Sequence, residues 1–190
     1  MDFGSLLKTS WDRFIREIVT LVLFTLVGAV LCITVILIPT VFAGWLRGVL
    51  GYIREGRTPQ FDELWNFDDY LQTLLLLIVG GLLVSLGYVF FIVPGVILQV
   101  WWFYSLFFIV DEKLRFADAM RESKNAVSRT GFFNHFVVVL IVAVLGLLGG
   151  TFSGLAMLLT TPFSLILMTL TYEEISESDL EDAPAAPEDL

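Results

Sequence analysis

Few side chains in this 190-residue chain could do chemistry, and they lie far apart. His135 is the one histidine and Cys32 the one cysteine, so neither a histidine metal cluster nor an intramolecular disulfide can form. The acids of FDELWNFDDY (residues 61–70) could suggest metal binding, but Asp68 and Asp69 open an apolar segment. A helix that begins there favours negative charge in its first turn. Phosphate loops and nucleic-acid motifs are also missing from the sequence. We therefore expect no enzyme activity, no metal or cofactor site and no nucleic-acid binding.

Arg47 is the one basic residue inside an apolar segment. It precedes Arg54 by about 10 Å of helix, at 1.5 Å per residue. A cation at the centre of a bilayer costs between about 2.5 and 17 kcal/mol. Two interpretations are therefore open: the side chain snorkels to the headgroups, or it makes a buried contact with a ligand or a partner. Gly44 and Gly48 flank Arg47 with the spacing that lets another helix approach closely.

Four further residues are candidates for packing or function. Pro94 and Gly95 lie in residues 71–110, a stretch without a charged residue. One helix of that length would measure about 60 Å, twice the thickness of a bilayer core, so the stretch must fold back. We expect it to reverse at Pro94, with Gly95 supplying turn freedom. Gln99 is expected to hydrogen-bond between helices, and Pro162 to kink the last apolar segment.

The apolar content requires a non-aqueous solvent for much of the chain. Hydrophobic residues make up 57% of the sequence, and the mean hydropathy is +0.83, whereas soluble domains are about 45–50% apolar. Uncharged runs of about 18 or more residues are typical of transmembrane helices. We predict an all-α polytopic membrane protein with six transmembrane helices in three hairpins. The expected spans are approximately residues 18–37, 39–54, 69–92, 94–110, 132–148 and 155–172.

The basic residues predict the orientation of these spans. All Lys and Arg residues except Arg47 fall before the first span, after the second, or between the fourth and the fifth. The turns LIPT, IVPG and GGTFSG at the other ends of the hairpins carry no charge. Because basic loops stay in the cytoplasm, we expect a multi-pass protein of the bacterial inner membrane with both termini cytoplasmic.

A short amphipathic segment precedes each hairpin. In residues 1–17 the apolar side chains recur at steps of three and four residues, with polar residues between them. Residues 58–67 and 115–129 also place apolar side chains on one side. Such helices lie in the headgroup plane with their apolar face towards the lipid. We call these three segments the cytoplasmic belt.

Residues 173–190 form an acidic tail. They contain eight acids and no base, and so account for most of the formal net charge of −9. A segment rich in proline, alanine and acids cannot bury enough apolar surface to fold alone. We therefore expect the tail to be disordered, with a docking segment as the alternative.

Three segments resemble a known group of proteins: residues 90–112 (FFIVPGVILQVWWFYSLFFIVDE), 117–136 (ADAMRESKNAVSRTGFFNHF) and 161–174 (TPFSLILMTLTYEE). They are similar to a broad group of uncharacterised prokaryotic six-helix integral membrane proteins, and to the membrane domain attached to some glycerophosphodiester phosphodiesterases. The motifs that recur in that group correspond here to IVPG (92–95), Asp111, Ala119 with Ser123, Pro162 and Tyr172. The resemblance implies a six-helix membrane fold and carries over no catalysis.

Two functions remain open at this point. The first is a non-catalytic membrane protein with a structural or accessory role, which binds lipid headgroups or a protein partner through the cytoplasmic belt. The alternative is a small uncoupled channel or transporter, possible as a homo-oligomer, with Arg47 near the pathway. The scarcity of ionisable groups inside the spans argues against an ion-coupled transporter.

Overall fold

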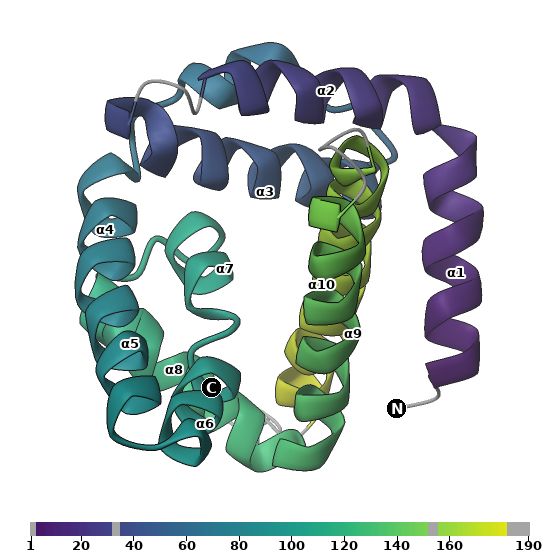
Figure 1. The fold of residues 1–190 in the computed structure, drawn as a ribbon. Helices are drawn as coiled ribbons and strands as arrows, with labels where there is room; N and C mark the ends of the chain where they lie inside the picture. Colours follow the sequence, from purple (N-terminus) through teal and green to yellow (C-terminus); the bar gives the residue numbers. More distant parts are fainter. Residues whose placement is uncertain (1–2, 32–34, 152–155, 182–190) are drawn as a thin grey trace, which may run out of the picture.

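The computed structural model describes residues 3–31, 35–151 and 156–181. Within these ranges every regular element is helical, which confirms the all-α class. Cys32 and the end of the acidic tail lie outside the described residues. The elements are α1 (Phe3–Arg16), α2 (Ile18–Leu31), η1 (Val35–Leu37), α3 (Ile38–Glu55), η2 (Phe61–Trp65), α4 (Tyr70–Leu75), η3 (Leu76–Gly80), α5 (Gly81–Phe90), α6 (Ile92–Trp101), α7 (Ser105–Val110), α8 (Phe116–Thr130), α9 (Phe132–Thr151) and α10 (Met157–Glu181) (Figure 1).

The number of membrane spans is smaller than six by length and composition. Three helical stretches among the described residues are long and apolar enough to cross a bilayer: Tyr70–Phe90, Ile92–Val110 and Phe132–Gly150. The count reaches four if α1 and α2, which meet at an angle of 85°, form one broken span. With 14 residues, α2 covers only about 21 Å, and α3 contains three charged residues. The chain thus has several helices that suit a membrane, as expected for a membrane protein.

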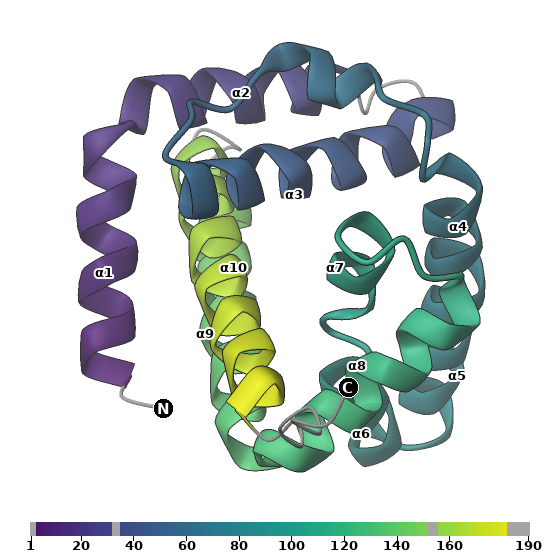
Figure 2. The same cartoon turned by 180° about the vertical axis from the view of Figure 1, so that it is seen from behind.

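The first hairpin also runs in an unexpected direction. Figures 1 and 2 show α2 and α3 side by side, crossing the direction of α1, α9 and α10. The structure is therefore not a bundle of six parallel helices. In Figure 2, η2, α8 and the C-terminal end of α10 lie on the face turned towards the viewer. We call this the charged face, because the loops that carry most of the ion pairs lie beside these elements.

The second hairpin reverses where the sequence predicts it. Only Phe91, in an extended conformation (φ −161°, ψ 143°), separates α5 from α6. Pro94 occupies the first turn of α6, where a missing N–H group costs little. Gly95 does not supply turn freedom, contrary to expectation. It lies inside α6, where a Cβ would be 2.5 Å from the ring of Tyr88, so its absent side chain lets α5 and α6 pack closely.

The expected fourth span is broken near its middle. Residues 102–104 separate α6 from α7, and Ser123 of α8 stabilises this break. The Ser123 hydroxyl donates to the carbonyl of Trp101 at 2.7 Å and accepts the N–H of Tyr104 at 3.2 Å. These bonds satisfy two backbone groups that an unbroken helix would have paired within itself.

The cytoplasmic belt packs against the protein more than expected. The apolar side of α8 is buried against the helices around it, with Ala119, Ala126 and Val127 inaccessible to solvent. It therefore cannot face the lipid. The expected helix over residues 58–67 is shorter: only η2, a single 3₁₀ segment, forms there, and it packs on α3. In α1, Phe14 is buried and its ring lies 6.0 Å from that of Phe163 in α10.

The acidic tail is partly helical. The last helix, α10, continues through Pro162 and extends to Glu181, so residues 173–181 are not disordered as expected. Ile175 explains this extension, because its side chain is 1% exposed and belongs to the main core. That core also includes Tyr104, Phe107 and Tyr172, with the rings of Phe107 and Tyr172 stacked at 4.8 Å.

Candidate functional site

Arg47 joins α3 to two loops at the charged face. Its Nη1 donates to the carbonyl oxygen of Glu63 at 2.9 Å, and Nη2 donates to the carbonyl oxygen of Asn66 at 3.4 Å and to Oδ2 of Asp69 at 3.3 Å. Lys113, which follows α7, donates to the same carboxylate oxygen at 2.8 Å. The side chains of Arg47 and Asp69 are 13% and 7% exposed. Arg47 therefore makes a buried contact with its own chain.

A second cluster lies around Arg54 at the end of α3. Two guanidinium nitrogens of Arg54 bind both carboxylate oxygens of Asp111, and Nε donates to Glu173 of α10 at 2.7 Å. The hydroxyl of Tyr172 donates to Asp111 at 3.0 Å. Burial alone would raise the pKa of Asp111, but the hydrogen bonds from Arg54 and Tyr172 hold it below its ordinary value. This cluster fixes α10 to α3 and to the end of α7.

A third ion pair closes the loop between α3 and η2. Arg57 donates to Glu63, and its Nε donates to Glu55 at 2.9 Å. Burial raises the pKa of Glu63 above its ordinary value, although Arg57 opposes this. The same pairing, led by its hydrogen bond to Glu63, raises the pKa of Arg57.

A polar pocket of about 340 Å³ lies among these three clusters. Its charged lining consists of Arg47, Arg54, Arg57, Glu55, Glu63 and Asp111. Three cations face three anions, and the ion pairs described above already engage the cations. An anionic ligand would have to displace these internal partners. We interpret the pocket as a structural junction and not as a ligand site.

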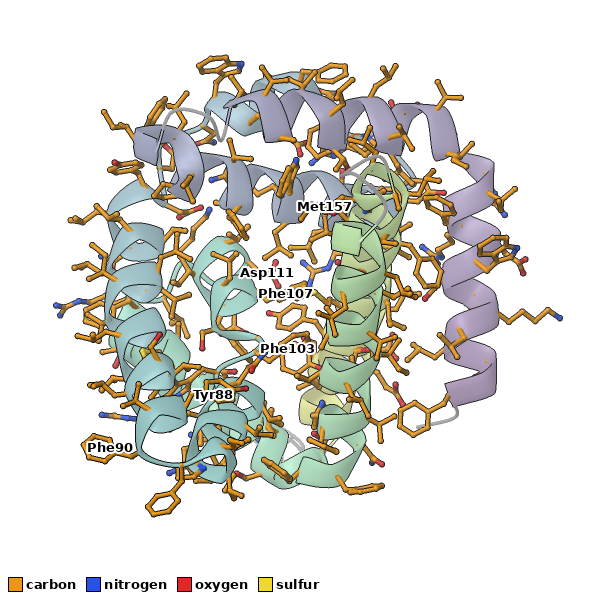
Figure 3. The ribbon with its side chains drawn as sticks, viewed as in Figure 1. Tyr88, Phe90, Phe103, Phe107, Asp111 and Met157 are labelled. Carbon is orange, nitrogen blue, oxygen red and sulfur yellow. The ribbon has the colours of Figure 1, made fainter. Side chains whose placement is uncertain are left out.

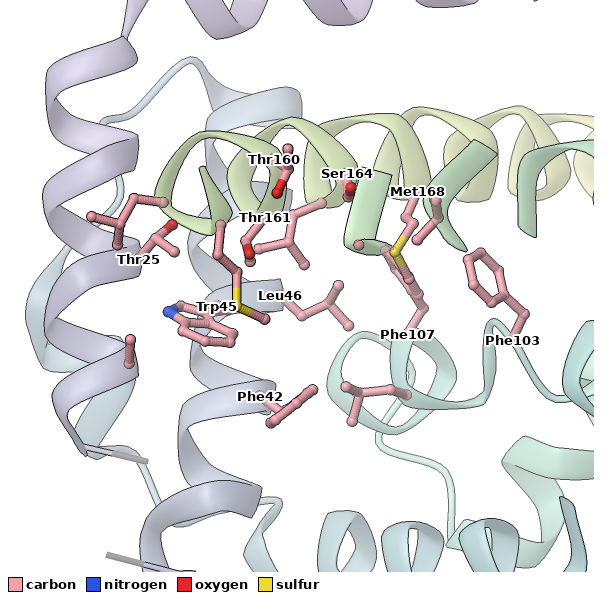
Figure 4. A pocket seen from close by; sticks show the side chains of 17 residues that line it. Thr25, Phe42, Trp45, Leu46, Phe103, Phe107, Thr160, Thr161, Ser164 and Met168 are labelled. Carbon is pink, nitrogen blue, oxygen red and sulfur yellow. The ribbon is translucent and has the colours of Figure 1, made fainter. Parts of the chain in front are cut away.

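A larger cavity lies between α2, α3, α7, α9 and α10, and its volume is about 560 Å³ (Figure 4). This volume is within the range of about 300–1,000 Å³ that is usual for ligand pockets. Its lining among the described residues contains no Asp, Glu, Lys, Arg or His. Leaving such a space empty in a packed interior would cost on the order of 10 kcal/mol, at about 24 cal/mol per Å³. The cavity is therefore suited to an apolar occupant.

The two ends of this cavity differ in polarity. Figure 4 shows the hydroxyl-bearing Thr25, Thr160 and Thr161 near Trp45 at one end, and Phe103 and Phe107 at the other. Figure 3 shows Phe103, Phe107 and Asp111 in succession towards the interior, while Phe90 points outward at the α5–α6 turn. Asp111, beyond the aromatic end, belongs to the Arg54 cluster. The cavity thus has a weakly polar end and an aromatic end next to the ionic clusters.

The residues singled out from the sequence are not brought together in one site. Arg47 lines the polar pocket and not the cavity. Gly44 accommodates η2, because a Cβ there would lie 2.5 Å from the carbonyl oxygen of Glu63. Gly48 accommodates Phe24 of α2, whose ring would be 2.7 Å from its Cβ. The glycine face therefore packs against a loop and a neighbouring side chain of the same chain.

The other predicted residues have local roles. Gln99 accepts a hydrogen bond from the hydroxyl of Tyr88, which links α6 to α5. Pro162 is buried within α10 and does not end that helix. Pro94 and Gly95 lie at the α5–α6 turn, far along the chain from every lining residue of the polar pocket except those near Val110.

Sequence reasoning missed a buried polar cluster next to the break in the fourth span. His135 is fully buried, with Nδ1 3.1 Å from the hydroxyl of Tyr104 and Nε2 in contact with the hydroxyl of Thr130. The cluster holds α9 against α7 and α8, and it contains no acid or thiol. Ser123, which the resemblance brought forward, is the one residue of this region that the sequence indicated.

The described residues contain no group of His, Cys, Asp and Glu side chains that could hold a metal ion. No protein-family model matches the chain, and neither a curated protein nor a solved structure matches it significantly. The function is therefore argued from the geometry alone.

Proposed function

We propose that this chain is a non-catalytic protein of the bacterial inner membrane with a structural or accessory role, and that its charged face lies among the lipid headgroups. The observation that carries the proposal is the contrast between ions and aromatic rings at this face. The buried ions pair within the chain, as Arg47 and Asp69 do. The aromatic side chains remain exposed, with Trp11 at 55% and Trp65 at 52%.

Exposed aromatic rings next to charged residues suit a membrane interface. Tryptophan is enriched at the headgroup level, where its ring is apolar and its N–H group can still meet water. Leu7, Trp11 and Ile15 follow each other at four-residue steps along α1 and are all exposed, so they form one stripe on this helix. Phe61 and Phe67 add exposed rings on either side of η2.

We further propose that all three hairpins enter the bilayer from the charged face, which gives six crossings and two cytoplasmic termini. The uncharged turns support this orientation. A first hairpin that enters and returns without crossing would leave the sides of all other loops unchanged. Cysteines introduced at Ile36 and Val93 in a Cys32→Ser background should react with a membrane-impermeant reagent from outside, and one at Ser128 should not. Reaction at Ser128 from outside would contradict the orientation.

Fluorescence quenching tests the interfacial position of the belt. Variants that keep only Trp11 or only Trp65, with the other tryptophans changed to Phe, are reconstituted in vesicles of phosphatidylethanolamine and phosphatidylglycerol. We expect shallow spin-labelled lipid to quench both rings more than deep spin-labelled lipid does. A variant that keeps only Trp45, which is 9% exposed, is the control. Strong quenching of Trp65 by aqueous iodide and not by lipid would contradict the proposal and favour a protein partner.

A further inference from the structure

The 560 Å³ cavity points to a second function that does not depend on the charged face. We propose that it binds one acyl chain of a membrane phospholipid, with the ester end of the lipid at the hydroxyl-bearing end of the cavity. The chemical class of the ligand follows from three properties of the site: the chemistry of its lining, the difference between its two ends, and the solvent to which it opens.

Water is a poor occupant for this cavity. A buried water needs two to four polar partners, and the polar groups here are few and partly engaged. The hydroxyl of Thr25 already donates to the carbonyl of Leu21 at 2.8 Å, and Nε1 of Trp45 donates to the carbonyl of Phe24 at 3.4 Å. Leu46, Phe107 and Met168 offer no strong hydrogen-bond partner. An apolar occupant therefore fits the lining better than a water cluster does.

The polarity of the two ends sets the direction of the ligand. Thr160 and Thr161 lie in the first turns of α10 near Trp45, and their hydroxyls can donate to ester oxygens. The opposite end is formed by Phe103, Phe107 and Met168. A molecule that is apolar along most of its length and carries acceptor oxygens at one end matches this gradient. An acyl chain with its glycerol ester has that distribution.

The membrane supplies the ligand at high concentration. The cavity is partly open, and α9, which forms one wall, is apolar enough to span a bilayer. Gly146 of α9 and Ala29 of α2 both line the cavity and are themselves exposed. The opening therefore faces hydrocarbon, and a phospholipid chain can enter without leaving the bilayer. The absence of charged lining residues among those described disfavours a free fatty acid, whose carboxylate would need a cation.

Photolabelling with two plugged variants tests this assignment. The full chain is reconstituted in vesicles of phosphatidylethanolamine and phosphatidylglycerol that contain a phosphatidylglycerol with a diazirine on one acyl chain. Gly146→Phe places a ring into the cavity, because a Cβ at Gly146 meets no atom within 4 Å. Ala29→Phe fills it from the opposite wall. Gly81→Phe is the matched control: its Cβ also meets no atom within 4 Å, and Gly81 does not line the cavity.

The expected result is labelling of peptides that contain Leu46, Leu106 or Val142, which line the cavity. This labelling should fall about tenfold in both plugged variants and stay unchanged in Gly81→Phe, because overpacking opposes an occupant by at least that factor. Equal labelling of the wild type and both plugged variants would overturn the proposal. Labelling by a photoreactive free fatty acid or a small apolar probe, but not by the phospholipid, would also overturn it. Circular dichroism of each variant confirms that it is folded.

Discussion

Two hollow regions of this molecule have opposite contents. The polar pocket of about 340 Å³ at the charged face is surrounded by ions that bind one another, whereas the cavity of about 560 Å³ is lined by apolar side chains and a few hydroxyls. In the first region the chain provides its own partners, through contacts such as Arg47 with Asp69. In the second it leaves space that hydrocarbon can fill. The comparison indicates that the ions hold the fold together and that the apolar region is the better candidate for ligand binding.

The same contrast occurs within one cluster. Asp69 binds two cations: Arg47, whose side chain is 13% exposed, and Lys113, which is 57% exposed. A buried ion without its partner is costly, whereas an exposed pair contributes little because solvent screens it. The two cations should therefore differ in their importance for stability, although they share one carboxylate.

The largest effect is expected for Asp69→Ala. This change leaves the buried guanidinium of Arg47 without its carboxylate, and breaking a buried pair in this way costs about 3–5 kcal/mol. The free energy of unfolding in detergent micelles, measured by denaturant titration, should fall by that amount. Lys113→Ala is the control, with an expected loss of about 0–1 kcal/mol. Equal losses in both variants would show that the burial of Arg47 does not determine the stability of this cluster.

A smaller effect is expected for Gly44→Ala, which tests how α3 and η2 pack beside the polar pocket. The new Cβ would lie 2.5 Å from the carbonyl oxygen of Glu63 and 2.8 Å from Cα of Leu64. Both are backbone atoms, so η2 must shift, and overpacking of this kind costs about 1–3 kcal/mol. Gly81→Ala, where a Cβ meets no atom within 4 Å, should instead stabilise the chain by up to about 1 kcal/mol through helix propensity. A neutral Gly44→Ala would mean that η2 does not pack against α3 in the membrane.

The sequence predicted local features better than it predicted the arrangement of the helices. Pro94 correctly marked the reversal of the second hairpin, because a missing N–H group and a fixed φ act locally. The partners of Arg47 were not predictable, since Glu63 and Asp69 are 16 and 22 residues away. The role of Gly95 was also missed: its close contact with Tyr88 depends on how two helices cross and not on the turn itself.

The orientation of the first hairpin was the main error. Apolar runs indicate helices that avoid water, but they do not fix the direction in which two such helices pack. Here α2 and α3 cross the direction of α9 and α10 (Figure 1). The apolar cavity between these helices could not be predicted for the same reason, because its lining comes from several elements, among them Thr25, Trp45 and Thr161. None of them forms a motif in the sequence.

The smallest expected effect concerns the pH dependence of the Arg54 cluster, where two carboxylates share one cation. Burial opposes ionisation of Asp111, but the hydrogen bonds from Arg54 and Tyr172 lower its pKa below the ordinary value of 3.8. Its contribution to stability is therefore present above that value and is lost as the pH falls through the folded-state pKa. Burial raises the pKa of Glu173 above 4.5 despite Arg54, so its contribution has the opposite sign and declines as the pH rises through the folded-state pKa. The free energy of unfolding should thus differ between the wild type and Asp111→Asn at neutral pH, and this difference should shrink in acid. Glu173→Gln should remove the decline with rising pH. A difference between the wild type and Asp111→Asn that stays constant through the acid range would show that the folded chain does not favour the ionised Asp111.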